Sequence, residues 1–484
     1  MKATKADLYD VIVFGGGPAG STAGNLLARQ GRRVLVLEKE RFPRHHIGES
    51  LLPGLNYLYR RLGVRDILRR EGFFRKTGGS YIWGKTRDPW SITFIQFDEA
   101  PVPCATSSEV FAYHVDRGRF DELLLRQCAK VGAEVRQKAT VVDIGLKGET
   151  VTGVTYRTAD GRRRRAEASF YLDASGQAAL IPNRLGWRAF DPQLRHMAVY
   201  TYFKGAKLLE GARRNHIFVV NIPDGWLWYI PISAARVNVG VVTSIDKSKE
   251  AGRDLERFLM DRVRGAPEIA RLMKRARRVE RLRVERDWSY RSRRFAGDNF
   301  LLLGDAAAFV DPLLSYGVTL AMHSGALAAD CVDIALGNPE RRKRMIAHYD
   351  EVHARRFDEL LEFVKYFYDG NRDREEYFWK ARRVVRHVRN RYSKCAFTYL
   401  VSGYTMWDKV LHKPYFARFF AGLGAPVEKL KGDKRFLRAA AGLQASDLPP
   451  MIDEAFPAPP GAEKDWARRS VALRIASAAI RGEG

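Results

Sequence analysis

Apolar residues near the N-terminus follow the order strand, glycine-rich turn, helix, strand. Residues 10–14 (DVIVF) form a short apolar run that predicts a buried strand, and residues 21–30 predict a helix rich in alanine and leucine. Gly31 ends that helix, and residues 34–37 predict a second buried strand that Glu38 closes. This order indicates a βαβ unit.

Two further segments combine a strand pattern with glycine. Residues 170–176 (FYLDASG) form one, and residues 299–305 (NFLLLGD) form the other, followed by a helical pattern at about 319–336. Residues 77–113 and 195–245 differ, because they are rich in aromatic and β-branched residues with partial alternation, which predicts antiparallel strands. In the second of these, Ala198, Tyr200 and Tyr202 are expected to share one face.

The predicted fold is α/β, with a Rossmann-like nucleotide domain, an inserted antiparallel-sheet substrate domain and a C-terminal helical region. We place the boundaries of the first module at 1–340, with nucleotide parts at about 1–75, 105–190 and 285–340, a substrate sheet at about 76–104 and 191–284, and the helical region at 341–484. In that region, helices are expected at 349–369, 373–391 and 467–480, and a proline-rich loop at 449–461.

The composition supports a folded but strongly basic protein. The chain has 484 residues, of which 46% are hydrophobic, and a net charge of +27. The basic residues fall in separate clusters without a helix-turn-helix, RNP or Cys/His-finger pattern, so solvated surface is the favoured interpretation and nucleic acid the least favoured. An anionic protein or carrier partner is a third interpretation, less favoured than solvated surface and more favoured than nucleic acid.

Cysteine usage and hydropathy indicate a cytoplasmic enzyme. The four cysteines form no CxxC pair, and the ten histidines show no ligand spacing, so we expect no metal. The N-terminus is polar, which argues against a signal peptide. No apolar run approaches the roughly 18 residues of a membrane span, so we expect no transmembrane segment.

The glycine-rich turn carries a dinucleotide fingerprint. Gly15 permits the tight turn, Gly17 lets the backbone approach a pyrophosphate at the helix N-terminus, next to Ala19, and Gly20 allows close helix–strand packing. Glu38 can accept hydrogen bonds from the ribose hydroxyls. The alternative is a glycine-rich turn without a ligand.

The late Gly304-Asp305 pair favours FAD over NAD. Asp305 ends a second strand near the fingerprint and can bind ribityl or ribose hydroxyls of an extended FAD, although it could instead cap a helix. No second GxGxxG is present, so no dedicated NAD(P)H domain is expected.

Four stretches together resemble the flavin-dependent halogenase family. Residues 41–50 (RFPRHHIGES) continue the fingerprint region, residues 226–231 (WLWYIP) fit WxWxIP, and residues 309–317 (FVDPLLSYG) fit FxxPxxSxG. Lys76, in FRKTGG, lies where the family carries its catalytic lysine. The motif WxWxIP is the most specific of the four.

The resemblance implies FADH2 supplied by a separate flavin reductase, together with oxygen and chloride or bromide. Hypohalous acid would form beside the flavin and reach Lys76, with Trp226 and Trp228 walling the flavin off from the substrate. Flavin-contacting positions would be Arg44, Ser50 and Arg117, and Ser315, Tyr316 and Gly317 would offer halide their backbone N–H groups. Each has an ordinary alternative: a surface cation for Lys76, core packing for the tryptophans and a plain turn for 315–317.

One position departs from the halogenases of free tryptophan. Those carry a glutamate just before the serine of FxxPxxSxG, where this chain has Leu314. The departure favours a small aromatic substrate that activates its own ring, a phenol or pyrrole, free or held on an acyl or peptidyl carrier protein. A geranylgeranyl-reductase-like or hydroxylating flavoenzyme of the same fold is the alternative.

Overall fold

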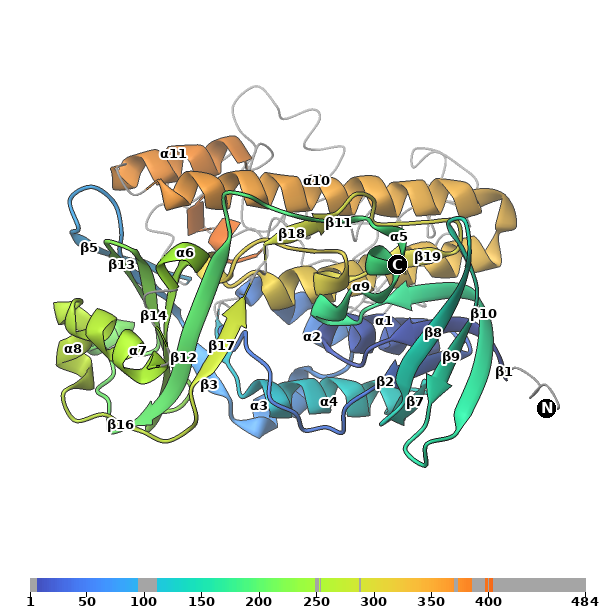
Figure 1. Ribbon diagram of the computed structural model, residues 1–484, viewed down its shortest axis with the longest axis horizontal. Helices are drawn as coiled ribbons and strands as arrows, with labels where there is room; N and C mark the ends of the chain where they lie inside the picture. The colour runs from blue at the N-terminus through green and yellow to red at the C-terminus, as the bar shows by residue number, and fades with distance from the viewer. Residues whose placement is uncertain are drawn as a thin grey trace, which may run out of the picture. The chain divides into compact units, whose positions relative to one another are not determined.

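The computed structural model describes residues 7–94, 111–248, 252, 254–286, 289–369, 373–384, 397–398 and 400–403 (Figure 1). Residues 1–96 and 111–406 form one compact unit, which contains all the described residues. The predicted loop at 449–461 and helix at 467–480 lie outside the described residues.

The first sheet belongs to the nucleotide-binding part. Its order is β7-β2-β1-β10-β9-β8, and β19 also pairs with β10. The pairs joining β7, β2, β1, β10 and β19 are parallel, whereas β8, β9 and β10 pair antiparallel. The strands are β1 (Asp7–Phe14), β2 (Val34–Glu38), β7 (Glu134–Gln137), β8 (Thr140–Lys147), β9 (Thr150–Arg157), β10 (Arg163–Asp173) and β19 (Phe300–Leu302).

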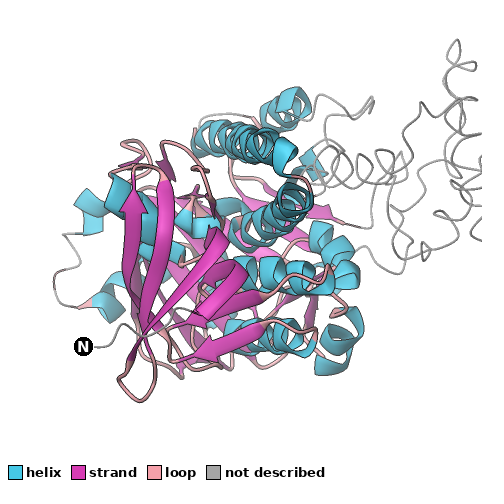
Figure 2. Cartoon of the chain, turned by 90° about the vertical axis from the view of Figure 1, so that its right-hand side faces the viewer, coloured by secondary structure: helices cyan, strands magenta, loops and turns pink. Residues whose placement is uncertain are grey.

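Helices α1 (Pro18–Arg29), α4 (Arg117–Lys130) and α9 (Gly317–Gly337) contact strands of this sheet. Figure 2 shows helices stacked beside strands. α1 lies between α4 and α9 in these contacts. The close approach of α1 to the preceding turn requires Gly20, because a Cβ there would collide with the carbonyl oxygen of Gly15. The predicted Rossmann-like βαβ unit is therefore confirmed.

The second sheet is the predicted inserted one. Its order is β16-β12-β15-β14-β13-β4-β5, with β17 also beside β12. All its pairs are antiparallel except β13–β4, which is parallel, so the expectation of a purely antiparallel sheet is wrong at that pair. The strands are β4 (Gly78–Ile82), β5 (Pro89–Thr93), β12 (His196–Lys204), β13 (Ile217–Ile222), β14 (Gly225–Pro231), β15 (Arg236–Ser244), β16 (Arg277–Arg278) and β17 (Arg283–Arg286).

Alternation along β12 separates the two faces of this sheet. Val199 and Phe203 belong to the hydrophobic core formed with helices α7 (Leu255–Arg264) and α8 (Pro267–Met273). Tyr200 and Tyr202 point to the other face, where both rings contact His45. The predicted common face of the two tyrosines is therefore confirmed.

The long helix α10 (Arg342–Tyr368) connects the two sheets (Figure 1). At its start, Arg342 Nη2 donates to the carbonyl of Ser169 on β10 (3.0 Å). At its end, the hydroxyl of Tyr368 lies 2.8 Å from Trp226 Nε1 on β14. The helix expected at 349–369 is α10, which begins earlier than predicted, at Arg342. The described part of the helix expected at 373–391 is α11 (Arg374–Val384), and residues 385–391 lie outside the described residues.

Helix α9 corrects one expectation from the sequence. Among the described residues it is the one helix long and apolar enough to cross a membrane by length and composition, and such a segment had not been expected. However, 94% of its most apolar window is buried inside the protein, where α1 and α10 cover it. It is therefore packed as a core helix.

Short elements complete the described chain. They are α2 (Asn56–Arg61), α3 (Arg65–Glu71), α5 (Leu180–Leu185), α6 (Ile245–Ser248), β3 (Phe74–Lys76), β6 (Ala112–His114), β11 (Arg188–Phe190), β18 (Tyr290–Ser292) and β20 (Ala308–Phe309). β3 and β6 form a two-stranded antiparallel sheet of their own.

Candidate active site

A cavity of about 860 Å³ is lined by residues of both sheets. Most of the residues singled out in the sequence meet there: Gly15, Gly17, Ala19, Glu38, Arg44, Ser50, Arg117, Trp226, Trp228, Asp305, Ser315 and Gly317. The lining does not include Gly20, Lys76 or Tyr316.

The glycine turn forms one end of the cavity. Gly15 has a φ of +102°, a conformation that favours glycine, and a Cβ at Gly17 would touch only Arg44 at 3.4 Å, so the backbone there stays open to a ligand. No side chain caps the first turn of α1. Glu38 accepts hydrogen bonds from the N–H groups of Gly16 (2.7 Å) and Glu40 (2.8 Å), which fixes its carboxylate in the cavity wall.

The polar groups of this cavity fit an FAD molecule. The buried hydroxyl of Ser50 has no hydrogen-bond partner in the described structure, so it is open to a ligand. Burial raises the pKa of Asp305 to about 6, and its carboxylate lines the cavity, where hydroxyl donors would satisfy it. Asp305 lies inside the short 3-10 helix Gly304–Ala306, whose N-cap residue is Leu303, and α9 begins only at Gly317. Asp305 therefore caps neither helix, and the helix-cap alternative is wrong.

Two arginines predicted at the flavin are already bound to protein groups. Arg117 holds both carboxylate oxygens of Asp121, at 2.9 and 3.0 Å, and donates to the carbonyl of Ile47. Arg44 also donates to Asp121 (3.1 Å). Arg117 therefore braces the segment before Ser50, as well as lining the cavity.

The two tryptophans of WxWxIP form a wall of the cavity on β14. Both are buried, and their ring centroids lie 5.8 Å apart. Trp228 Nε1 donates to Asn238 Oδ1 (2.8 Å), and Trp226 Nε1 donates to the hydroxyl of Tyr368 (2.8 Å). Gly240 leaves room for Trp228, because a Cβ there would collide with its ring. The rings are therefore fixed in place.

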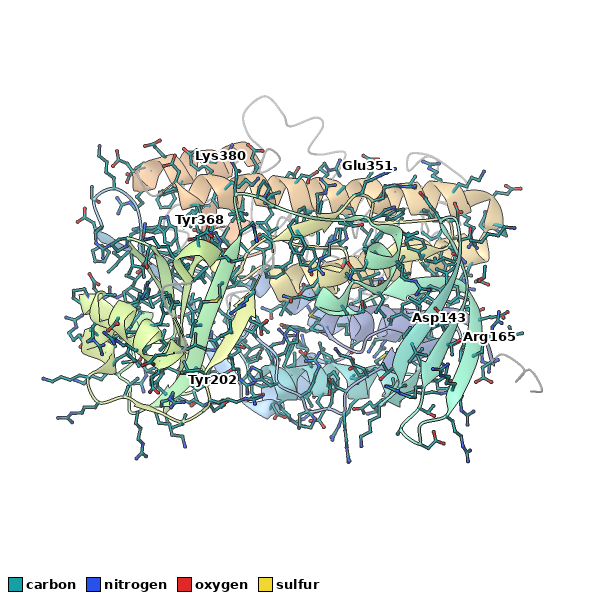
Figure 3. The ribbon with its side chains drawn as sticks, viewed as in Figure 1. Asp143, Arg165, Tyr202, Glu351, Tyr368 and Lys380 are labelled. Atoms are coloured by element: carbon teal, nitrogen blue, oxygen red, sulfur yellow. The ribbon has the colours of Figure 1, made fainter. Side chains whose placement is uncertain are left out.

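Glu49 is a cavity residue that the sequence reasoning missed. Its carboxyl accepts hydrogen bonds from Tyr202 (2.7 Å) and Asn238 (2.5 Å), and Tyr202 is labelled near the lower end of β12 in Figure 3. Burial raises the pKa of Glu49 to about 7, although both hydrogen bonds oppose this. Its place in IGES was visible in the sequence, but its burial was not.

A second network joins the wall to the 309–317 loop. The hydroxyl of Tyr368, labelled at the end of α10 in Figure 3, donates to Asp311 Oδ2 (3.0 Å). His196 Nδ1 lies 3.4 Å from the same oxygen. Because Tyr368 also accepts from Trp226, α10 holds the wall and the loop together.

The loop itself presents backbone to the cavity. Ser315 has a φ of +59°, which is uncommon for a residue with a side chain, and both Ser315 and Gly317 line the cavity. The N–H of Ser315 donates to the carbonyl of Pro312 (3.0 Å), so the prediction that it offers a halide this group is wrong. A Cβ at Gly317 would lie 2.8 Å from the ring of Phe309, so glycine is needed there. Tyr316 does not line the cavity, and its hydroxyl donates to the carbonyl of Leu400, so its side chain belongs to the packing of the C-terminal segment.

Lys76 lies behind the cavity wall at the end of β3 and is only 3% exposed, which excludes the surface-cation alternative. Its Nζ donates to the carbonyl of Leu51 (3.0 Å), directly after the cavity residue Ser50, and lies 5.6 Å from the centre of the Phe94 ring. Burial lowers its pKa from 10.5 to about 7, so near neutral pH much of it is the nucleophilic free amine.

Among the described residues, no group of three or more His, Cys, Asp or Glu side chains could hold a metal ion. The absence of a metal in the chemistry stays a prediction.

Comparison with known proteins identifies the class of enzyme. The family model described as tryptophan halogenase matches residues 10–106 and 96–432. The chain therefore belongs to the flavin-dependent halogenase family, whose members use FADH2 and halide to halogenate aromatic substrates. This favours the halogenase interpretation over the hydroxylase or reductase alternative.

Individual relatives agree with the family. The chain is 35% identical over 380 residues to tryptophan 2-halogenase of Chondromyces crocatus, covering 78% of this chain and 70% of that protein. It is 30% identical over 383 residues to a 1H-pyrrole-2-carbonyl-[peptidyl-carrier protein] chlorinase of Pseudomonas fluorescens, covering 75% and 84%. The solved myxobacterial chondrochloren halogenase CndH is 36% identical with a TM-score of 0.72, covering 84% of this chain and 93% of that one.

Proposed function

We propose that this halogenase acts on a phenol or pyrrole, free or held on a carrier protein, and that Lys76 delivers the halogen. The burial of Lys76 with its pKa near 7 carries the proposal, because it places a free amine next to the FAD-fitting cavity. The similarity to a pyrrolyl-carrier-protein chlorinase supports the substrate class.

When bound, FADH2 would supply two electrons to oxygen, and the resulting oxidant would convert halide into hypohalous acid. In the proposed site, Ser50, Asp305 and Glu38 hold the cofactor. The backbone N–H of Gly317, at the start of α9, receives the halide, because the N–H of Ser315 already donates to the carbonyl of Pro312 (3.0 Å). Trp226 and Trp228 separate the cavity from the substrate side, so the oxidant reaches the ring as halogen.

Leu314 supports an activated ring. It is buried and apolar, so it can neither stabilise a cationic ring intermediate nor remove its proton. A phenolate or pyrrole stabilises that cation itself, because its heteroatom donates electrons to the ring. Two further parts of the proposal come from the family and the composition alone: a separate flavin reductase and a cytoplasmic location.

The test supplies a flavin reductase, NADH, FAD, oxygen and bromide to phenol, pyrrole and carrier-bound candidates. The halogen isotope pattern in the product mass spectrum is the readout. We expect Lys76→Ala to retain FAD and lose product, while Lys85→Ala, which changes an exposed lysine, keeps both. Normal halogenation by Lys76→Ala would show that the lysine is wrongly assigned, and hydroxylated product would overturn the function.

A further inference from the structure

Two buried histidines lie beside Lys76 and have no part in the cofactor cavity. His114 is on β6 and is completely buried, and His216, just before β13, is 1% exposed. Each has one ring nitrogen without a hydrogen-bond partner in the described structure: Nδ1 of His114 and Nε2 of His216. A buried imidazole with an unused nitrogen costs stability, so it calls for a reason.

The strand register places His114 on the same side as Lys76. In the antiparallel pair β3–β6, Lys76 is opposite Ala112 and Phe74 is opposite His114. Residues two apart along a strand share a face, so Lys76 and His114 are diagonal neighbours on one face. Such pairs are within reach of long side chains. Burial is the main cause that holds the pKa of His114 well below its usual range, and the charge of Lys76 is the second cause.

The hydrogen bond of His114 fixes which nitrogen is the base. Its Nε2 lies 3.1 Å from the carbonyl oxygen of Asn215, which can only accept, so Nε2 carries the hydrogen. In the neutral ring, Nδ1 therefore carries a lone pair that no donor uses. Burial keeps the ring neutral at neutral pH, so this lone pair is available as a proton acceptor.

His216 completes the surroundings of the lysine. Its Nδ1 lies 3.0 Å from Ser80 Oγ, and its Nε2 occupies space left by Gly78, where a Cβ would be 2.7 Å away. Within the part of the chain that the structure describes, the charged and titratable groups that act on the two rings are Lys76, Arg213 and the rings themselves. No carboxylate is among these described groups, so a ring nitrogen is the acceptor they offer for protons released at Lys76.

We propose that His114 accepts the proton that Lys76 releases during halogen transfer. In this role it substitutes for the glutamate that halogenases of free tryptophan carry where this chain has Leu314. This inference rests on the proposed role of Lys76. His216 is a positioning residue that keeps the surroundings of the lysine neutral.

The reaction balances in two steps. In the first, the Lys76 amine attacks hypohalous acid, the N–halogen bond forms and the O–halogen bond breaks. His114 takes the proton from nitrogen and passes it to the departing hydroxide, giving water. In the second, the C–halogen bond forms as the N–halogen bond breaks, and the ring proton returns through His114 to nitrogen. A weak base suffices in the first step because a halogenated ammonium is far more acidic than an ordinary one.

The test compares His114→Gln with His353→Gln. Glutamine can keep the donor to Asn215 but lacks the basic nitrogen, and His353 is a matched control, because it is also buried with a free Nδ1 but packs against Phe295. Both variants are first checked for FAD content and thermal unfolding. Hypohalous acid is then measured with a soluble scavenger, and halogenated product is measured from about pH 6 to about pH 9.

We expect His114→Gln to form hypohalous acid normally but to lower the rate of product formation about 100-fold. Its rate should keep rising with pH, because hydroxide must replace the missing base, whereas the wild type and His353→Gln should level off once Lys76 is deprotonated. An unchanged rate and pH profile in His114→Gln, with Lys76→Ala inactive, would overturn this inference alone. Normal activity in Lys76→Ala would overturn the proposed function as well.

Discussion

At the scale of single residues, the site depends on burying groups that prefer water. Glu49 directly precedes Ser50 and Leu51 in the chain, and Lys76 donates to the carbonyl of Leu51. Burial moves the pKa values of both groups to about 7 from opposite directions. Groups poised near neutral pH are efficient proton donors and acceptors, whereas ordinary surface lysines and glutamates are fixed in charge. The same burial lowers stability.

The stability cost of Lys76 can be measured. Its pKa is about 7 when folded and near 10.5 when unfolded, so the penalty is complete below about pH 7 and disappears as the pH rises toward about 10.5. We expect Lys76→Met to raise the free energy of unfolding at neutral pH by up to about 4 kcal/mol. Urea unfolding at several pH values is the measurement. A gain that is absent, or that grows with rising pH, would contradict the assigned pKa.

At the scale of elements, the cavity wall depends on a helix that follows it by more than a hundred residues. β14 carries the two tryptophans, but Trp226 is held by Tyr368 at the end of α10. The same hydroxyl holds Asp311 in the loop before α9. The side chain of Tyr368 therefore links β14, the loop before α9 and helix α10 through hydrogen bonds. The C-terminal helical region is thus part of the site.

Replacing this hydroxyl tests the role of α10. We expect Tyr368→Phe to cost about 1–3 kcal/mol of stability, because Trp226 loses its buried acceptor and Asp311 loses a donor. FAD affinity should fall as well, measured by titrating the apoprotein. Tyr349→Phe is the control on the same helix, because its hydroxyl donates to Leu302 and does not contact the wall. Equal FAD affinities in the two variants would rule out a role for Tyr368 at the cavity.

At the scale of the whole molecule, two sheets built from discontinuous segments meet at one cavity. The second sheet takes β4 and β5 from before α4 and the remaining strands from after β10. The chain has 83 Lys and Arg against 56 Asp and Glu, and its basic residues fall in separate clusters along the sequence. Such a charge favours fast encounter with an acidic macromolecule but adds little for a small neutral substrate.

Salt dependence separates these two kinds of substrate. If the aromatic group arrives on an acidic carrier protein, kcat/KM should fall steeply as NaCl rises from about 50 mM to about 500 mM, because screening removes electrostatic attraction. The same aromatic group as a free compound should show little dependence and serves as the control. Equal insensitivity for both would argue against a carrier-bound substrate.

Much of the fold follows from local patterns. The turn at Gly15, the close approach at Gly20 and the alternation through Tyr200 and Tyr202 were predicted because each depends on neighbours along the chain. The parallel pairing of β4 with β13 was not predicted, because it depends on which distant strands meet. The membrane-like composition of α9 also became interpretable only once its burial was known.

The sequence by itself determined the cofactor turn, the motifs and therefore the family. Only the tertiary structure decided the electrostatics of the site: that Lys76 is buried against Leu51 and Phe94, that Glu49 is enclosed by Tyr202 and Asn238, and that His114 keeps a free nitrogen nearby. The physical reason is that a pKa follows from desolvation and from charges nearby in space. The groups that bury a side chain and the charges beside it come from distant segments of the chain, which only the fold brings together.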